Sequence, residues 1–257
     1  MAKTDTEREL PVKKETQQIK IMDIHTHILP GVDDGAKDMH EALSLVRQAR
    51  ENGTRAIVLT PHYRAPYKMN ADLLYKRFCL FRKAVHKEIP QMRVYLGCEI
   101  RHQSGIPQML NDRTLLPMYH SRYILLEFTS TAFSTQILSA ARELVGYGYI
   151  PIIAHIERLD AFRNDPQLIS QMEAMGVLMQ MNADSVMGKS GLRIKKFCHN
   201  VLSAQQVHFI ASDAHDAIRR PPLLKECYLH ISEKYSESYA RKLFWENPQA
   251  VVKNEDI

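Results

Sequence analysis

Short runs of apolar and β-branched residues recur along the chain, and more polar stretches separate them. The runs cover residues 19–25, 56–60, 94–98, 123–127, 150–154, 177–181 and 207–211. Within most runs the apolar residues are continuous and do not alternate with polar ones, which is typical of strands buried on both faces of a parallel sheet. The pattern therefore predicts a series of buried parallel strands.

The stretches between these runs carry the start and stop signals of helices. Capping side chains or a first-turn proline precede apolar residues at helical spacing. The predicted helices begin at Asp38, Asn70, Asp165-Pro166 and Ser236. The predicted stops are Gly53, Gly176 and Asn247-Pro248. Glycine suits the left-handed backbone that ends many helices, and proline is common just past a helix end.

Strands and helices alternate along the chain, which is the signature of βα units that close into an α/β barrel. A chain of 257 residues has a typical length for one such barrel. No change in composition and no low-complexity segment interrupts the chain after residue 20. We therefore expect one domain over residues 20–257, preceded by a flexible, polar N-terminal extension over residues 1–19.

Composition and charge describe an ordinary globular protein. Hydrophobic residues make up 45% and charged residues 25% of the chain, which suffices for a large core. The formal net charge of +5 suits anionic substrates but does not by itself favour nucleic acid. The four scattered cysteines favour a reducing, cytoplasmic location over a disulfide framework. We expect neither a signal peptide nor a transmembrane segment, because no apolar run has the required length and flanks.

Side chains that can bind metal ions follow six of the seven predicted strands. In chain order they are His25, His27, Asp33, Asp34, His62, Glu99, Glu127, His155, Asp213 and His215. The C-terminal strand ends of an α/β barrel converge on one face, so we expect these groups to meet. A single histidine is more often a hydrogen-bonded imidazole than a ligand, but so many carboxylates and imidazoles in one barrel mouth would be costly without cations. The set therefore predicts a metal centre with nitrogen and oxygen ligands.

Other chemistries lack their sequence signatures. A cysteine phosphatase needs an arginine at a fixed offset after its cysteine, and none of the four cysteines has one. The chain contains no phosphate-binding loop of the G-x-x-x-x-G-K-[ST] kind and no G-x-S-x-G nucleophile elbow. Cys98, although it adjoins Glu99, is expected to be a small buried hydrophobic residue.

The residues after the strands resemble the PHP (polymerase and histidinol phosphatase) superfamily, and in particular its bacterial capsular-polysaccharide tyrosine phosphatases. The resemblance runs from about residue 21 to near the C-terminus and rests on the segments HTHILPGVDDG, TPH, GCEIR, AHIER, SDAH and RRPP. It implies an α/β fold, a distorted (β/α)7-type TIM-like barrel of the PHP kind. The chain departs from the usual pattern at Tyr63, Cys98 and residues 182–195, none of which is a proposed ligand.

The resemblance also implies a cluster of up to three metal ions, with manganese expected first and iron, magnesium or zinc as alternatives. The first metal would be held by His25, His27, Glu99 and Asp213. Glu99 would bridge to the second, which Glu127 and His155 would also hold. The third would be held by Asp34, His62 and His215. Arg158 and Arg220 match family arginines that bind the phosphate, although either could instead be a surface ion-pair residue.

The function implied by the resemblance is hydrolysis of phosphotyrosine on the tail of a bacterial tyrosine autokinase that regulates capsule or exopolysaccharide synthesis. Two alternatives remain open. Another PHP phosphoesterase, such as a histidinol phosphatase or a 3′ exonuclease, would use the same metal site, and a non-catalytic scaffold would keep only the fold. We expect no nucleic-acid partner, because a strong basic and aromatic strip is lacking. Members of the family can form rings, which leaves a homo-oligomer open.

Overall fold

The computed structural model describes residues 19–257, so the predicted extension over residues 1–19 lies outside the described residues except for its last residue. All strand pairs are parallel. The strands are β1 (Ile21–Thr26), β2 (Thr54–Leu59), β3 (His62–Tyr63), β4 (Arg93–Leu96), β5 (Glu99–Arg101), β6 (Tyr123–Glu127), β7 (Ile150–Ile153), β8 (Leu178–Asn182) and β9 (Phe209–Ala211). Each predicted apolar run contains one of these strands or most of one.

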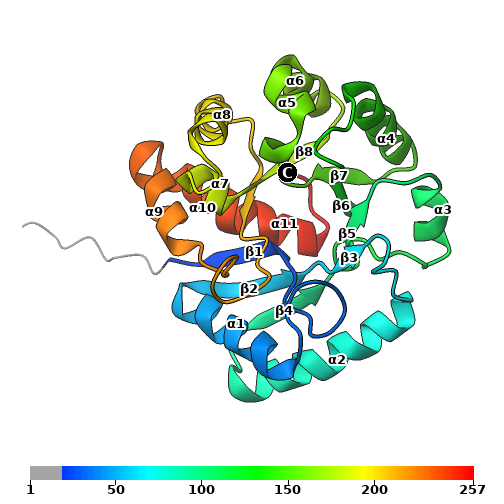
Figure 1. Ribbon diagram of the computed structural model, residues 1–257, viewed down its shortest axis with the longest axis vertical. Helices are drawn as coiled ribbons and strands as arrows, with labels where there is room; N and C mark the ends of the chain where they lie inside the picture. The colour runs from blue at the N-terminus through cyan, green and yellow to red at the C-terminus, as the bar shows by residue number, and fades with distance from the viewer. Residues whose placement is uncertain (1–18) are drawn as a thin grey trace, which may run out of the picture.

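The strands curl into a distorted barrel (Figure 1). β3 continues the line of β2, and β5 continues that of β4, because hydrogen bonds such as Gly97 N to Leu59 O (2.8 Å) bridge the breaks. β9 returns to β1, where Asp213 N donates to His25 O at 2.9 Å. The seven resulting strand lines follow the order β1, β2/β3, β4/β5, β6, β7, β8, β9. The prediction of a distorted TIM-like α/β barrel is confirmed.

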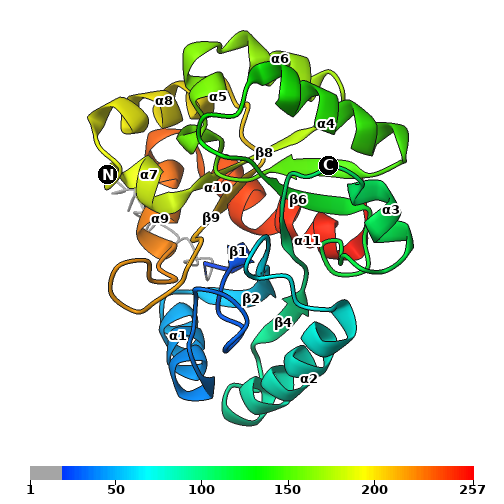
Figure 2. The same cartoon turned by 45° about the vertical axis from the view of Figure 1, so that its right-hand side comes forward.

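Helices cover the outside of the barrel. They are α1 (Met39–Glu51), α2 (Ala71–Glu88), α3 (Ile106–Asn111), α4 (Ser134–Gly146), α5 (Asp160–Asn164), α6 (Gln167–Glu173), α7 (Ala183–Met187), α8 (Leu192–Ser203), α9 (Lys225–Lys234), α10 (Glu237–Arg241) and α11 (Asn247–Lys253), with short turns η1 (Ile156–Arg158) and η2 (Lys242–Glu246). Figure 2 shows α1 and α2 beside β1, β2 and β4, and α4 and α6 on the opposite side of the molecule. The large outer core lies between these helices and the strands.

The predicted helix starts are confirmed by their capping bonds. The side chains of Asp38, Asn70 and Ser236 accept hydrogen bonds from backbone N–H groups in the first turns of α1, α2 and α10. Asp165 likewise accepts from Gln167 N at 3.1 Å. These bonds satisfy N–H groups that have no partner within the helix.

The prediction that the last helix ends near Asn247-Pro248 is wrong. Helical structure continues from α10 through a π-helical turn into α11 and ends at Lys253. Pro248 lies in the first turn of α11, directly after the π-helical turn. The continuation lets Val251 join the inner core, which consists of inward-facing residues such as Ile24, Leu125 and Phe209. α11 therefore completes the apolar interior, and the opposite, C-terminal strand ends are left for polar side chains.

Candidate metal centre

A bulge in β1 turns the first predicted ligand inward. The register of β1 against β2 shifts between Asp23 and Thr26, so that Ile24 and His25 together face a single residue of β2. Ile24 packs in the inner core, whereas His25 reaches Glu99, with 3.3 Å between His25 Nε2 and Glu99 Oε1. The bulge therefore marks the boundary between the apolar interior and the polar mouth.

The loop after β1 packs tightly against His27, and Gly35 makes this approach possible. A Cβ atom on residue 35 would lie 1.8 Å from His27 O, so any side chain there would displace the loop. Asp33 of the same loop accepts a hydrogen bond from His27 Nδ1 at 2.7 Å and another from His62 N at 3.0 Å. The bond to Nδ1 leaves His27 Nε2 with its lone pair directed at the cluster.

Two further ligands owe their position to left-handed backbone. His155 has φ of 36° and Asp213 has φ of 55°. Non-glycine residues in such conformations store on the order of 1–3 kcal/mol of strain and are concentrated at functional sites. Asp213 and His215 both lie in the loop after β9, which ends at Ala211. Asp213 lies with His25 and His27, and His215 lies with Asp34 and His62.

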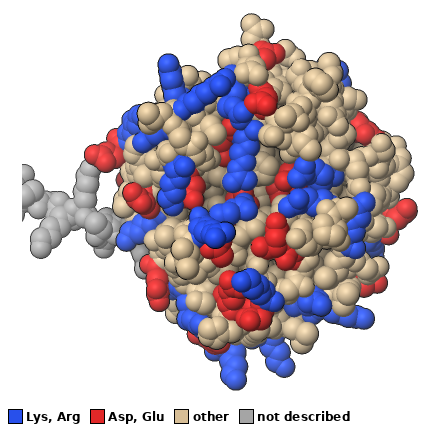
Figure 3. Space-filling view, in the orientation of Figure 1, with Lys and Arg blue, Asp and Glu red and all other residues tan. Residues whose placement is uncertain are grey.

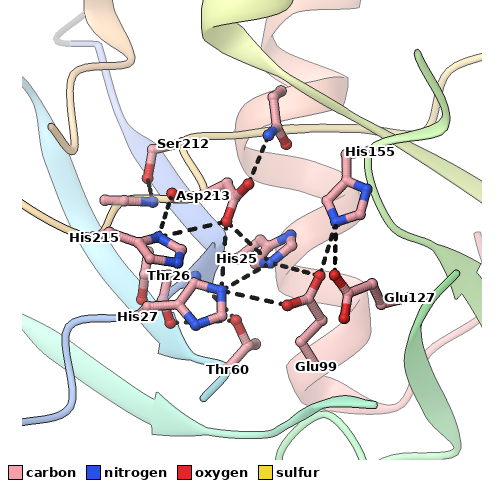
Figure 4. A network of polar contacts seen from close by, with 12 residues as sticks. His25, Thr26, His27, Thr60, Glu99, Glu127, His155, Ser212, Asp213 and His215 are labelled. Carbon is pink, nitrogen blue, oxygen red and sulfur yellow. Dashed lines mark hydrogen bonds and ion pairs between the residues drawn. The ribbon is translucent and has the colours of Figure 1, made fainter. Parts of the chain in front are cut away.

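All nine predicted ligands meet at the C-terminal strand ends, and Figure 4 shows seven of them facing one another. Three groups have ligand atoms within 4.8 Å of one another: His25, His27 and Asp213; His62, Glu99 and Glu127; and His27, Asp34, His62 and His215. Glu99 lies between the first two groups, because its Oε2 is 3.4 Å from His27 Nε2 and 2.6 Å from His62 Nδ1. His155 Nε2 lies 2.9 Å from Glu99 Oε1.

The donor atoms of this cluster fit divalent cations. Glu99 Oε2, His62 Nδ1 and His215 Nε2 are buried and make no hydrogen bond, although Glu99 Oε2 and His62 Nδ1 lie 2.6 Å apart. An unpaired buried polar atom costs about 1–3 kcal/mol, so several at one place need a compensating partner. Imidazole nitrogen and carboxylate oxygen suit Mn²⁺, Fe²⁺, Mg²⁺ or Zn²⁺, and among residues 19–257 no cysteine belongs to the three groups, so a softer metal is not favoured.

Charge within the cluster keeps its central carboxylates ionised. Burial alone would raise the pKa of Glu99, but the neighbouring His25 and hydrogen bonds from His155 and other histidines hold that pKa well below its usual value. Burial would likewise raise the pKa of Asp213, which His25, His27 and Arg220 hold well below the usual range. Burial also lowers the pKa of His215 to about 3, so that this residue presents a neutral imidazole.

Residues that orient the ligands were not predicted. His25 Nδ1 donates to Gln180 Oε1 at 3.2 Å, and the backbone N–H of His155 donates to the same oxygen at 2.8 Å. Gln180 in turn donates to Asn182, whose Nδ2 donates to Asp213 Oδ2 at 2.8 Å. The available signal was the pair of polar residues at alternate positions of β8, a strand that is otherwise apolar.

Arginines surround the mouth of the cluster. Arg158 and Arg220 both contact Asp213 Oδ2, Arg158 at 3.0 Å from its Nη1. Arg101 donates from Nε to Glu127 Oε2 at 2.8 Å, and Arg64 Nη2 lies 3.3 Å from Asp34 Oδ2. Sequence reasoning identified the first two arginines but missed Arg64 and Arg101. Figure 3 shows Lys and Arg side chains gathered around the middle of this face, with acidic side chains among them.

A cavity of about 560 Å³ lies apart from the cluster, beside α2, and contains none of the predicted ligands. Two arginines, Arg82 and Arg113, line it together with apolar and aromatic residues. We assign the chemistry to the ligand cluster instead, because within residues 19–257 this is where several buried donor atoms without hydrogen bonds converge.

Comparisons with known proteins show which family the chain belongs to. The family model for capsular polysaccharide synthesis proteins, CpsB/CapC, matches residues 21–253. The chain belongs to the CpsB/CapC family. The tyrosine-protein phosphatase CpsB of Streptococcus agalactiae is 30% identical over 243 residues, covering 92% of this chain and 100% of that protein. The tyrosine-protein phosphatase YwqE of Bacillus subtilis is 33% identical over 238 residues, covering 92% and 93%.

Solved structures of other proteins share the fold of this CpsB/CapC family member. A crystal structure described as one of YwqE from Bacillus subtilis and CpsB from Streptococcus pneumoniae, unique metal-dependent tyrosine phosphatases, has a TM-score of 0.87 and 32% identity, over 92% of this chain and 96% of that one. A phosphotriesterase homology protein from Escherichia coli has a TM-score of 0.58 at 13% identity, which shows a shared fold only. Among the described residues, no helix is both long and apolar enough to cross a membrane.

Proposed function

We propose that the protein is a metal-dependent tyrosine-protein phosphatase and that residues 20–257 form its single catalytic domain. The observation that carries the proposal is the convergence of nine imidazole and carboxylate side chains, several with unpaired buried donor atoms, at the barrel mouth. Membership in a family whose curated members are named tyrosine-protein phosphatases supports the substrate.

The proposed ligand sets follow the three groups of the cluster. His25, His27, Asp213 and Glu99 would hold the first metal. Glu99 would also serve a second together with Glu127 and with His155, which lies outside the three groups but has its Nε2 at 2.9 Å from Glu99 Oε1. Asp34, His62 and His215 hold a third. His62 lies between the second and third positions, because its Nδ1 is 2.6 Å from Glu99 Oε2 and its Nε2 is 3.4 Å from Asp34 Oδ1. Mn²⁺ is the proposed ion, with Fe, Mg or Zn as alternatives.

When bound, divalent cations would lower the pKa of bound water toward ~7 and would polarise the phosphoryl group. The chain supplies the rest. Gln180 and Asp33 fix the rings of His25 and His27 through their Nδ1 atoms, so that both Nε2 lone pairs face the cluster. Arg158 and Arg220 lie at the mouth with half-exposed side chains and can form charge-assisted hydrogen bonds to phosphate oxygens. These arginines neutralise charge that redistributes onto those oxygens during transfer.

The proposed substrate is phosphotyrosine in the flexible tail of a bacterial tyrosine kinase that regulates capsule or exopolysaccharide synthesis. The family description names capsular polysaccharide synthesis, and a tail can enter the mouth of a barrel more readily than a folded surface can. The proposed location is the cytoplasm. Within residues 19–257 all four cysteines are free, and three of them are buried, which agrees with a reducing compartment.

A substrate panel tests the proposal. Phosphotyrosyl peptide, phosphoseryl peptide, histidinol phosphate and single-stranded DNA are assayed with added Mn²⁺, and kcat/KM is compared. We expect the phosphotyrosyl peptide to be preferred, and a clear preference for histidinol phosphate or DNA would assign the protein to another PHP activity. Arg158→Ala and Arg220→Ala should each reduce kcat/KM by about ten- to a hundredfold while bound metal stays constant. Arg142→Ala is the matched control, because Arg142 is an exposed arginine on α4.

A further inference from the structure

The loop after β3 places an aromatic side chain beside the metal cluster. Arg64 N donates to Tyr67 O at 3.2 Å and Lys68 N donates to Pro66 O at 3.0 Å, so residues 64–68 form a tight turn. The turn brings the Tyr67 ring back toward His62, with the two rings 18° from parallel and their centroids 6.3 Å apart. Tyr67 is only partly buried, so part of its side chain beside His62 is accessible to solvent.

The guanidinium of Arg64 belongs to the same surface. Arg64 Cζ lies 5.7 Å from the centroid of the Tyr67 ring. Its Nη2 is 3.3 Å from Asp34 Oδ2, and its Nε is 3.9 Å from Glu127 Oε2. That Nε atom is buried and makes no hydrogen bond. Two proposed ligand carboxylates therefore hold a flat cationic group at the mouth, next to an aromatic ring.

The surface formed by Arg64 and Tyr67 and the pair Arg158 and Arg220 lie next to different carboxylates of the cluster. Arg158 and Arg220 contact Asp213, whereas Arg64 lies 3.3 Å from Asp34 and 3.9 Å from Glu127 and does not contact Asp213. Figure 4 shows Asp213 and Glu127 on opposite sides of His25 and Glu99. A phosphate held near Glu99 and the arginine pair would therefore have the rest of its ester group on the side of Arg64 and Tyr67.

We propose that Arg64 and Tyr67 form a specificity-determining wall that packs against the aromatic ring of an aryl phosphate, an inference that rests on the proposed phosphatase function. Flat guanidinium and aromatic groups pack favourably against an aromatic ring. An alkyl phosphate such as phosphoserine has no ring to offer. The wall therefore makes the site selective for phosphorylated phenols, whereas the cluster and the arginine pair recognise phosphate alone.

Binding measurements on the metal-loaded protein test this selectivity. Dissociation constants are measured by calorimetry for phenylphosphonate, which carries a ring, and for inorganic phosphate, which does not. Tyr67→Leu should weaken phenylphosphonate binding about three- to tenfold, as expected for a lost aromatic contact, and phosphate binding much less. Tyr67→Phe keeps the ring and should retain the wild-type selectivity, which is the dissociation constant for phosphate divided by that for phenylphosphonate. Arg64→Lys keeps the charge but loses the flat group, and should lower this selectivity for phenylphosphonate over phosphate.

Tyr147→Leu is the matched control, because Tyr147 is exposed between α4 and β7, at the opposite end of the barrel from the cluster. If Tyr67→Leu changes the dissociation constants of phenylphosphonate and phosphate by the same factor, the proposed wall is overturned, while the phosphatase proposal stays intact. If wild-type protein fails to hydrolyse phosphotyrosyl peptide, the proposed function fails and the wall fails with it.

Discussion

At the scale of single residues, Glu99 is the group on which the centre depends most. It is fully buried, and its two oxygens lie within 3.4 Å of four histidines, His25, His27, His62 and His155. Glu127 lies at the edge of the cluster, where its closest partner is Arg101 at 2.8 Å. Loss of a carboxylate that is shared between two metal positions should therefore reduce metal binding more than loss of one that serves a single position.

Glu99→Gln should lower metal content at two positions, whereas Glu127→Gln should affect mainly one. The amide keeps the shape of the carboxylate but loses the charge that balances the cations. Metal per protein chain is measured by plasma mass spectrometry after equilibration with Mn²⁺, and circular dichroism confirms the fold. Equal metal stoichiometry in wild type and Glu99→Gln would show that the bridging role is wrongly assigned.

The sequence predicted ligand-type residues better than the residues that orient them. His, Asp and Glu at strand ends are visible as a set, because the C-terminal ends of parallel strands meet. Gln180 and Asn182 were missed, because their role comes from hydrogen bonds to residues far away in sequence. Arg64 and Arg101 were missed for a similar reason, since a surface arginine shows its direction only in three dimensions.

At the scale of elements, the predicted strands and helix starts agree with the structure, but the interruptions do not show in the sequence. The bulge of β1 and the breaks between β2 and β3 and between β4 and β5 depend on pairing with neighbours. Asn247-Pro248 carries a local stop signal, whereas tertiary packing carries the helix onward so that Val251 reaches the inner core. Local signals set where helices begin, and burial sets how far they run.

The connection between β8 and β9 carries an acid-sensitive contact. His208 Nδ1 accepts a hydrogen bond from Met179 N at 3.1 Å, which requires the unprotonated nitrogen. Burial, with a smaller contribution from Lys242, lowers the pKa of His208 to about 4. The unfolded chain has a histidine pKa near ~6.5, so it binds more protons than the folded chain between these values. Stability from His208 is therefore present above about pH 6.5 and is lost as pH falls toward about 4.

His208→Gln should reduce this acid sensitivity. Between about pH 7 and about pH 5, wild type should lose on the order of 1–2 kcal/mol more unfolding free energy than the variant. The measurement is urea unfolding of metal-loaded protein at both pH values. His86 is exposed on α2, so His86→Gln controls for the loss of a histidine and should keep the wild-type dependence of unfolding free energy on pH. Identical pH slopes in wild type and His208→Gln would refute the role given to His208.

At the scale of the whole molecule, the metal centre joins distant parts of the chain. His25 and His27 from β1 meet Asp213 from the loop after β9, next to the hydrogen bond from Asp213 N to His25 O that closes the barrel. Glu99 and His155 come from the middle of the chain. Metal binding should therefore stabilise the closed barrel as well as supply chemistry, because binding free energy adds to folding free energy.

Thiol chemistry has no place in this account. Cys98 is buried beside Glu99 in sequence, and burial raises the pKa of its thiol to about 12, which leaves it protonated and unreactive. Burial also raises the pKa values of Cys198 and Cys227. These three buried thiols are therefore poor nucleophiles, and we assign hydrolysis to the cluster of histidines and carboxylates.

The most direct test measures kcat/KM for a phosphotyrosyl peptide as metal is removed and returned. The protein is stripped with chelator, checked for fold by circular dichroism, and then titrated with Mn²⁺ while bound metal is counted. The account predicts that stripping reduces kcat/KM by at least about a hundredfold, since metal contributes several kcal/mol to transition-state stabilisation, and that activity returns in proportion to bound metal. Full activity in thoroughly metal-free buffer would contradict it.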